Sequence, residues 1–116
     1  MDPKTAALLD KQEITEVLFR YCRAVDRVDM DLLRSVFHPG AHDDHGVYVG
    51  PIEGLIARWN TPNAAYPITQ HAVSNILIDL DGATATVESY FNAVHRKQDA
   101  KGAIDEMLRG RYLDRF

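Results

Sequence analysis

The hydrophobic pattern of the chain changes its period once, and this change limits the folds that the sequence can adopt. Apolar residues recur at helical spacing in residues 10–28, about 30–37 and about 51–59. From His71 onward the pattern fits extended strands rich in Val, Ile, Thr, Tyr and Phe, at 71–80, 84–96 and 107–116. Helices followed by antiparallel strands predict an α+β fold, in which a curved sheet packs against a small helical group.

Turn and capping residues mark the limits of these segments. Asp29 is a plausible N-cap for the second helix, and the sequence His-Pro-Gly at 38–40 ends it. The stretch D-D-H-G-V-Y-V-G predicts one strand at about 43–49, and Asp-Gly at 81–82 predicts a tight turn between strands. The polar residues at about 97–104 predict a loop before the last strand.

Length, charge and cysteine content narrow the class of protein. The 116 residues predict a single domain, 1–116, with one core. The net charge of -4 comes from 17 acidic and 13 basic residues spread along the chain, which argues against a nucleic-acid partner. A single cysteine, Cys22, excludes an intramolecular disulfide. No signal peptide and no membrane-spanning run is visible, so we expect a soluble protein of the cytoplasm.

One carboxylate stands beside an apolar helix face. Asp26 lies one turn after Cys22 and next to Val25, where a buried charge needs a partner. It could be a solvated residue at the helix end, could pair with a nearby arginine, or could orient a histidine. His71, which opens the first long strand, is such a histidine, and an imidazole is suited to proton transfer at neutral pH. A carboxylate on one ring nitrogen would fix the tautomer and stabilise the imidazolium.

Other side chains could line the same site. Asn75 shares the face of His71 if the strand alternates regularly, and His95 lies late in the second long strand. Tyr48 could reach a cavity from its strand, and Trp59 is either core or pocket lining. His38, His42 and His45 match no zinc pattern, so we expect no metal. No nucleophile motif or phosphate loop is present, and no cofactor is expected.

Four segments in order resemble the SnoaL-like proteins of the NTF2-like superfamily. They are K-Q-E-I-T-E-V-L-F-R-Y-C-R-A-V-D-R-V-D at 11–29, F-H-P-G-A-H-D-D-H-G-V-Y-V-G-P at 37–51, Q-H-A-V-S-N at 70–75 and G-R-Y-L-D-R-F at 110–116. The resemblance implies a cone-shaped α+β barrel with a capped pocket, commonly in dimers or trimers. Within this superfamily the sequence is similar to scytalone dehydratase and bile acid 7α-dehydratase. This similarity implies that Asp26 and His71 form a catalytic dyad. It also implies that Tyr21 lies in the pocket and that His95 is a second histidine there.

The resemblance has one departure, because relatives continue past the last segment into a further strand that this sequence lacks. We therefore expect either a shortened chain or an edge completed by a partner, and a homo-oligomer in both cases. The function expected is a cofactor-independent, dehydratase-type lyase acting on a small apolar cyclic or polyketide-like substrate. The alternatives are a non-catalytic module that binds a small ligand or an assembly partner, and an isomerase or cyclase with the same dyad.

Overall fold

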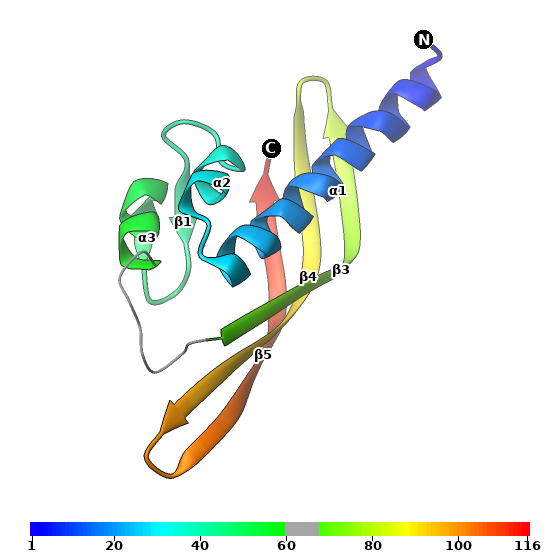
Figure 1. The fold of residues 1–116 in the computed structure, drawn as a ribbon. Coiled ribbons are helices and arrows are strands. Elements are labelled where there is room, and N and C mark those ends of the chain that lie inside the picture. The colour runs from blue at the N-terminus through cyan, green and yellow to red at the C-terminus, as the bar shows by residue number, and fades with distance from the viewer. Residues whose placement is uncertain (60–67) are drawn as a thin grey trace.

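Three helices and two antiparallel sheets make up residues 1–59 and 68–116, which are the residues that the computed structural model describes. The elements are α1 Pro3–Arg27, α2 Met30–Ser35, β1 His42–Asp44, β2 Val49–Pro51, α3 Ile52–Trp59, β3 Ile68–Asp81, β4 Thr84–Asp99 and β5 Gly102–Arg115. The sheet order is β3-β4-β5, and β1 pairs with β2. Figure 1 shows α1 across one face of the larger sheet, with α2 and α3 beside its C-terminal end. The predicted α+β fold is confirmed.

Helix α1 is longer than its apolar pattern predicts. It begins at Pro3, because Asp2 accepts a hydrogen bond from the backbone N–H of Thr5 (3.2 Å) and proline is well suited to the first helical position. Its first turns carry exposed apolar residues such as Leu8, so they lack the buried face that marks the rest of the helix. No helix among the described residues is long and apolar enough to cross a membrane.

Two hairpins differ from the prediction. The residues expected as one strand at 43–49 form β1 and β2, since Gly46 takes a positive φ of 74° and turns the chain. The polar residues expected as a loop at 97–104 instead extend β4 and β5, which pair as far as Asp99 and Gly102. Ion pairing across the hairpin, with Arg96 Nε 2.9 Å from Asp105 Oδ1, allows exposed polar residues to be strand residues here.

Two apolar clusters hold α1 in place. The middle of the helix packs Leu18 against Ala85 and Val87 of the sheet, with Ile14 and Val73 around them. Its last turns bury Ala24 against α2 and α3, in a cluster with Leu33, Ile52, Leu55 and Ile56. Burial of apolar surface at the middle and at the last turns fixes the height and rotation of the helix over β3. The last turns of α1, which carry Asp26, are therefore held over the sheet.

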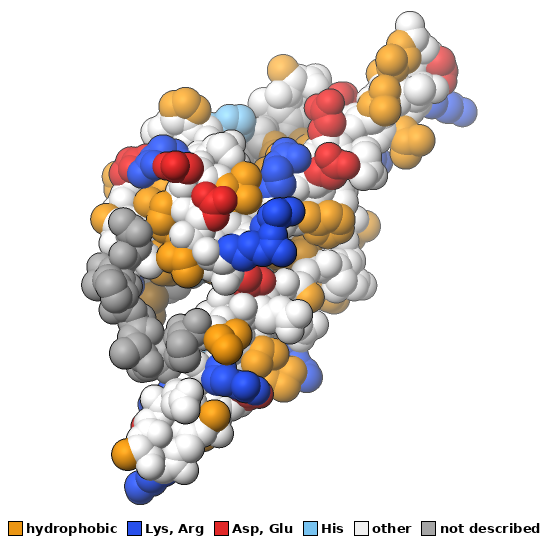
Figure 2. Space-filling view, in the orientation of Figure 1, with side chains coloured by type: hydrophobic (Ala, Val, Ile, Leu, Met, Phe, Trp, Pro, Cys, Tyr) orange, Lys and Arg blue, Asp and Glu red, His pale blue; other side chains and the backbone are white. Residues whose placement is uncertain are grey.

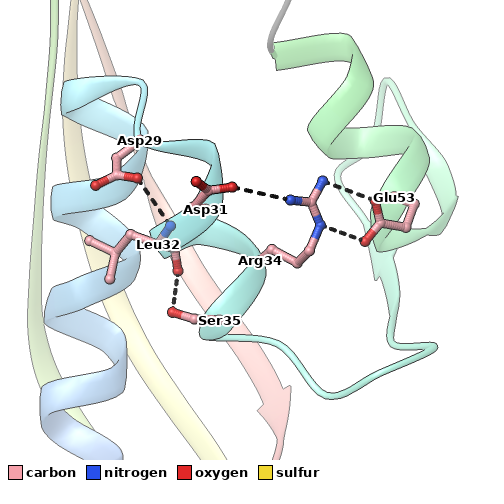
Figure 3. Close-up of polar contacts among 6 residues, drawn as sticks. All are labelled: Asp29, Asp31, Leu32, Arg34, Ser35 and Glu53. Carbon is pink, nitrogen blue, oxygen red and sulfur yellow. Dashed lines mark hydrogen bonds and ion pairs between the residues drawn. The ribbon is translucent and has the colours of Figure 1, made fainter.

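Polar contacts join α2 to its neighbours (Figure 3). The predicted N-cap is confirmed, because the Asp29 carboxylate accepts from the backbone N–H of Leu32 at 3.1 Å. Arg34 donates from Nε and Nη2 to the Glu53 carboxylate of α3, at 3.0 and 3.2 Å, and lies 3.6 Å from Asp31. This two-bond geometry is the stronger form of an arginine–carboxylate pair, so it helps to keep α3 against α2. Over the face seen in Figure 2, basic side chains lie beside acidic ones.

Candidate active site

Asp26 lies in the last turn of α1, in line with its buried residues. Leu18, Cys22 and Asp26 follow one another at four-residue spacing, and the first two are 4% and 7% exposed. Asp26 therefore continues the row that faces the sheet. The helix ends at Arg27, and its C-cap residue Val28 adopts a left-handed conformation (φ 53°), with its N–H bonded to the carbonyls of Ala24 and Val25.

His71 meets Asp26 from the facing strand. Its ring Nδ1 lies 2.7 Å from Asp26 Oδ1, and its backbone N–H donates to Asp26 Oδ2 at 2.9 Å. Thr69, two residues earlier on the same face of β3, donates its hydroxyl to Asp26 Oδ1 at 3.1 Å. The side chains of His71 and Asp26 are only 10% and 20% exposed. The carboxylate is thus held on both oxygens, and it is the helix-end residue that orients the histidine.

This arrangement determines which nitrogen of His71 can accept a proton. A carboxylate accepts hydrogen bonds and donates none, so the nitrogen beside it carries the hydrogen of a neutral ring. Nδ1 is therefore the N–H position, and Nε2 has the lone pair. The negative charge of Asp26 also stabilises the imidazolium that forms when Nε2 takes a proton. Chemically, this geometry suits proton transfer at His71 Nε2.

A second histidine lies beside this pair. The ring centroids of His71 and His95 are 5.6 Å apart, and His95 comes from β4, where it is paired with Thr69. Burial lowers the pKa of His95, and the nearby charge of His71 lowers it further. A second histidine with a lowered pKa therefore lies beside the pair.

Tyr21 belongs to an aromatic cluster on the same side of the sheet. Its ring lies edge-on to Phe37 (6.1 Å) and to Tyr112 (5.8 Å), and tilted against Trp59 (6.4 Å). Tyr112 is in turn stacked on Phe91 at 4.5 Å. Burial raises the pKa of Tyr21 well above its ordinary value, and the Tyr112 side chain raises it further by charge and by hydrogen bonding. Tyr21 is thus a neutral hydroxyl donor in apolar surroundings.

Two of the predicted site residues do not join this group. The Tyr48 hydroxyl donates to the carbonyl of Pro51 at 2.6 Å and lies against Gly54, so it holds β2 to the start of α3. Asn75 is exposed, because the β3–β4 register shifts between Ser74 and Leu77 and Asn75 adopts a positive φ of 51°. This bulge reverses the alternation, and Ile76 takes the inward position in its place.

The histidine-rich segment separates into exposed and interior residues. His38 and His42 are exposed, whereas His45 is half-buried and its Nδ1 lies 2.7 Å from Asp43 Oδ2. The His45 ring is edge-on to Trp59, with 5.1 Å between centroids. Within residues 1–59 and 68–116, no group of three or more His, Cys, Asp or Glu side chains is arranged to hold a metal ion.

Three contributors were missed by reasoning from the sequence. Thr69 had a usable signal, because it precedes His71 by two residues and so shares its strand face. Asp43 precedes His45 in the same way. Tyr112 had a weaker signal as the one aromatic residue between the arginines of the last strand, and it is the half-buried exception in an exposed β5.

Two depressions on the surface lie elsewhere. One is lined by Glu16, Phe19, Arg20 and Arg23 on the outer side of α1, and the other by residues of the α2–α3 region that include Arg34, Phe37 and His38. Neither is lined by Asp26 or His71.

Comparisons with known proteins agree with this architecture. Residues 6–116 match the SnoaL-like domain family. The uncharacterized protein Rv2910c of Mycobacterium tuberculosis is 32% identical over 85 residues, which are 70% of this chain and 57% of that protein. The chain thus spans a little over half the length of this curated relative.

Solved structures show the same fold at low sequence identity. The Kfla4162 protein of Kribbella flavida has a TM-score of 0.83 at 23% identity, over 94% of this chain and 80% of that one. A protein of Novosphingobium aromaticivorans described as a proposed scytalone dehydratase has a TM-score of 0.81 at 22% identity, over 97% and 76% of the chains. An NTF2-like superfamily protein of Salmonella enterica has a TM-score of 0.78 at 20% identity, over 90% and 77%. The chain belongs to the SnoaL-like domain family.

Proposed function

We propose that this protein is a cofactor-independent lyase of the dehydratase type. The observation that carries the proposal is the 2.7 Å contact between Asp26 Oδ1 and His71 Nδ1, in a carboxylate that is also held by a backbone N–H and by Thr69. A part-buried carboxylate with three fixed contacts, two of them to one histidine, is arranged as an orienting group for a base. Two solved neighbours described as proposed dehydratases support the reaction class.

The reaction begins at the carbon next to a carbonyl group. His71 Nε2 removes the α-proton of a substrate with a hydroxyl β to its carbonyl, while Asp26 stabilises the imidazolium. The Tyr21 hydroxyl, kept protonated by burial, donates to the carbonyl oxygen in place of Tyr112 as negative charge develops there. A positioned base of this kind contributes typically about 10²–10⁴-fold to the rate. The orientation of the substrate supplies further acceleration.

The aromatic cluster that contains Tyr21 favours a flat, largely apolar substrate. Tyr21, Trp59 and Tyr112 present aromatic rings, and Phe91 stacks on Tyr112. Such rings bind other rings by offset or edge-on contact. We therefore propose a small cyclic or polyketide-like β-hydroxy ketone as the substrate class.

The test is a screen of cyclic β-hydroxy ketones, in which the enone product is followed by its ultraviolet absorbance. We expect His71→Gln to reduce turnover by at least about 100-fold. The matched control is His42→Gln, since His42 is an exposed histidine of β1. Full activity in His71→Gln would overturn the assignment of the base.

Two alternatives lead to different outcomes of the same screen. An isomerase or cyclase with the same base would remove the α-proton without loss of water, so solvent deuterium would enter the substrate and no enone would form. A non-catalytic binding module would show ligand-dependent changes at His71 with neither exchange nor elimination.

A further inference from the structure

A second Asp–His pair lies outside the one used above. His45 Nδ1 is 2.7 Å from Asp43 Oδ2, the same separation as in the Asp26–His71 pair. The side chains of His45 and Asp43 are 31% and 21% exposed, so this pair is partly buried although it comes from a short hairpin. Side chains alternate along a strand, so Asp43 faces inward while its neighbours in β1, His42 and Asp44, face solvent.

The hairpin holds His45 in a defined position. The backbone N–H of His45 donates to the Tyr48 carbonyl at 2.7 Å, and Gly46 N–H donates to Asp44 Oδ1 at 3.0 Å. The His45 ring then meets the ring of Trp59 edge-on, at an interplanar angle of 83°. With Nδ1 toward Asp43, Nε2 is the nitrogen left for a proton exchange with another molecule.

The Asp43–His45 pair lies beside the aromatic cluster that contains Tyr21. Tyr21 and Tyr112 are in edge-on contact, with ring centroids 5.8 Å apart. Burial is the main cause that raises the pKa of both tyrosines, and the charge of Asp43 adds to it at Tyr21 while that of Asp26 adds to it at Tyr112. Trp59 contacts both His45 and Tyr21. Through Trp59, the aromatic cluster therefore joins His45 to Tyr21, the proposed donor to the carbonyl oxygen.

Resting on the proposed function, we infer that His45, oriented by Asp43, is the acid that protonates the leaving hydroxyl. Loss of water needs two proton transfers, since hydroxide is a poor leaving group. His71 Nε2 takes the α-proton, and the electron pair of the Cα–H bond forms the new double bond. The C–O bond breaks with its electron pair on oxygen, which takes the proton of His45 Nε2 and leaves as water. The products are the enone, water, protonated His71 and neutral His45, and exchange through solvent restores the starting charges.

The role of an acid can be separated from a structural role by changing the leaving group. The experiment compares two cyclic ketones of one skeleton, one with a β-hydroxyl and one with a β-acetoxy group. Both give the same enone, so one absorbance reading follows both reactions. Acetate leaves as a stable anion and needs no proton, so only the hydroxy compound depends on an acid.

We expect His45→Gln to lower kcat/KM for the hydroxy ketone by about 10²–10⁴-fold and for the acetoxy ketone by less than about threefold. His71→Gln lowers both, and the control His42→Gln lowers neither. Asp43→Asn serves as the second variant, with a smaller loss confined to the hydroxy ketone. A cooperative thermal unfolding transition, measured for each variant, serves to show that the variant is folded.

The possible failures differ from one another. Equal losses for the two ketones in His45→Gln would show a structural role, and no loss would place His45 outside the reaction. In both cases the inference is wrong, while the dependence on His71 still supports the proposed function. If the wild-type protein converts neither ketone nor any member of the screen, the proposed function fails and the inference fails with it.

Discussion

Replacing Asp26 by asparagine keeps the size of the side chain and removes what holds His71. The carboxylate accepts from His71 Nδ1, from the His71 backbone N–H and from the Thr69 hydroxyl. An amide has one accepting oxygen and an NH₂ group that donates. The backbone N–H and the Nδ1–H of His71 both need an acceptor, and asparagine offers only one oxygen. One of them then faces the asparagine NH₂ group, unless the imidazole changes its tautomer.

The size of the effect follows from these contacts. A hydrogen bond to a charged group contributes about 1.5–3 kcal/mol, so the free energy of unfolding should fall by about that amount. In a domain of this size the midpoint of thermal unfolding should drop by about 5–15 °C. The ring can relieve the conflict by moving its hydrogen from Nδ1 to Nε2. His71 Nε2 would then carry the hydrogen and could not accept the α-proton, so kcat/KM should fall by about 10²–10⁴-fold.

Three measurements follow the substitution. Circular dichroism gives the unfolding midpoint, enone absorbance gives kcat/KM, and nitrogen NMR of labelled histidine shows which ring nitrogen of His71 carries the hydrogen. Asp79→Asn is the matched control, since Asp79 is an exposed aspartate of the same strand. An Asp26→Asn protein with the wild-type midpoint and an unchanged His71 tautomer would refute the reasoning.

Two further predictions concern buried groups near the site. The Ser89 hydroxyl is buried with no hydrogen-bond partner among the described residues, so Ser89→Ala should raise the free energy of unfolding by about 1 kcal/mol; a fall of similar size in chemical denaturation would contradict this. Because the pKa of His95 is lowered, the unfolded chain binds more protons between that pKa and about 6.5, and stability should fall as pH drops through this window. Denaturation at about pH 7.5 and about pH 5 should show a smaller difference in His95→Gln, and an unchanged difference would contradict the assignment.

The sequence predicts the layers of the fold well because periodicity reports burial. Leu18 and Cys22 mark the buried row of α1, and the same spacing carries Asp26 toward the sheet. Asp29 signals the start of α2 through a local side-chain contact. Features that depend on partners distant in the chain are harder to predict. The polar residues of the β4–β5 hairpin become strand residues through contacts such as Arg96–Asp105, which composition alone does not indicate.

The candidate site was predictable in part. The Asp26–His71 assignment came from the helical spacing of Asp26 together with the family resemblance. The prediction that Asn75 shares the face of His71 is wrong because one bulge inverts the strand faces, and a bulge has no clear signal in V-S-N-I-L. Tyr48 does not join the candidate site because its hydroxyl donates to the Pro51 carbonyl three residues away. Tyr112 was missed because strand pairing, and not proximity in the chain, brings it to Tyr21.

The most direct test of the account is the exchange of an α-proton, since removal of this proton by His71 is the first step of the proposed reaction. A cyclic ketone from the screen is incubated in deuterated buffer, and incorporation of deuterium at the α-carbon is followed by proton NMR. The account predicts exchange with the wild-type protein and with His42→Gln, and a loss of at least about 100-fold in His71→Gln. Exchange at the wild-type rate in His71→Gln would contradict the claim that His71, held by Asp26, is the base.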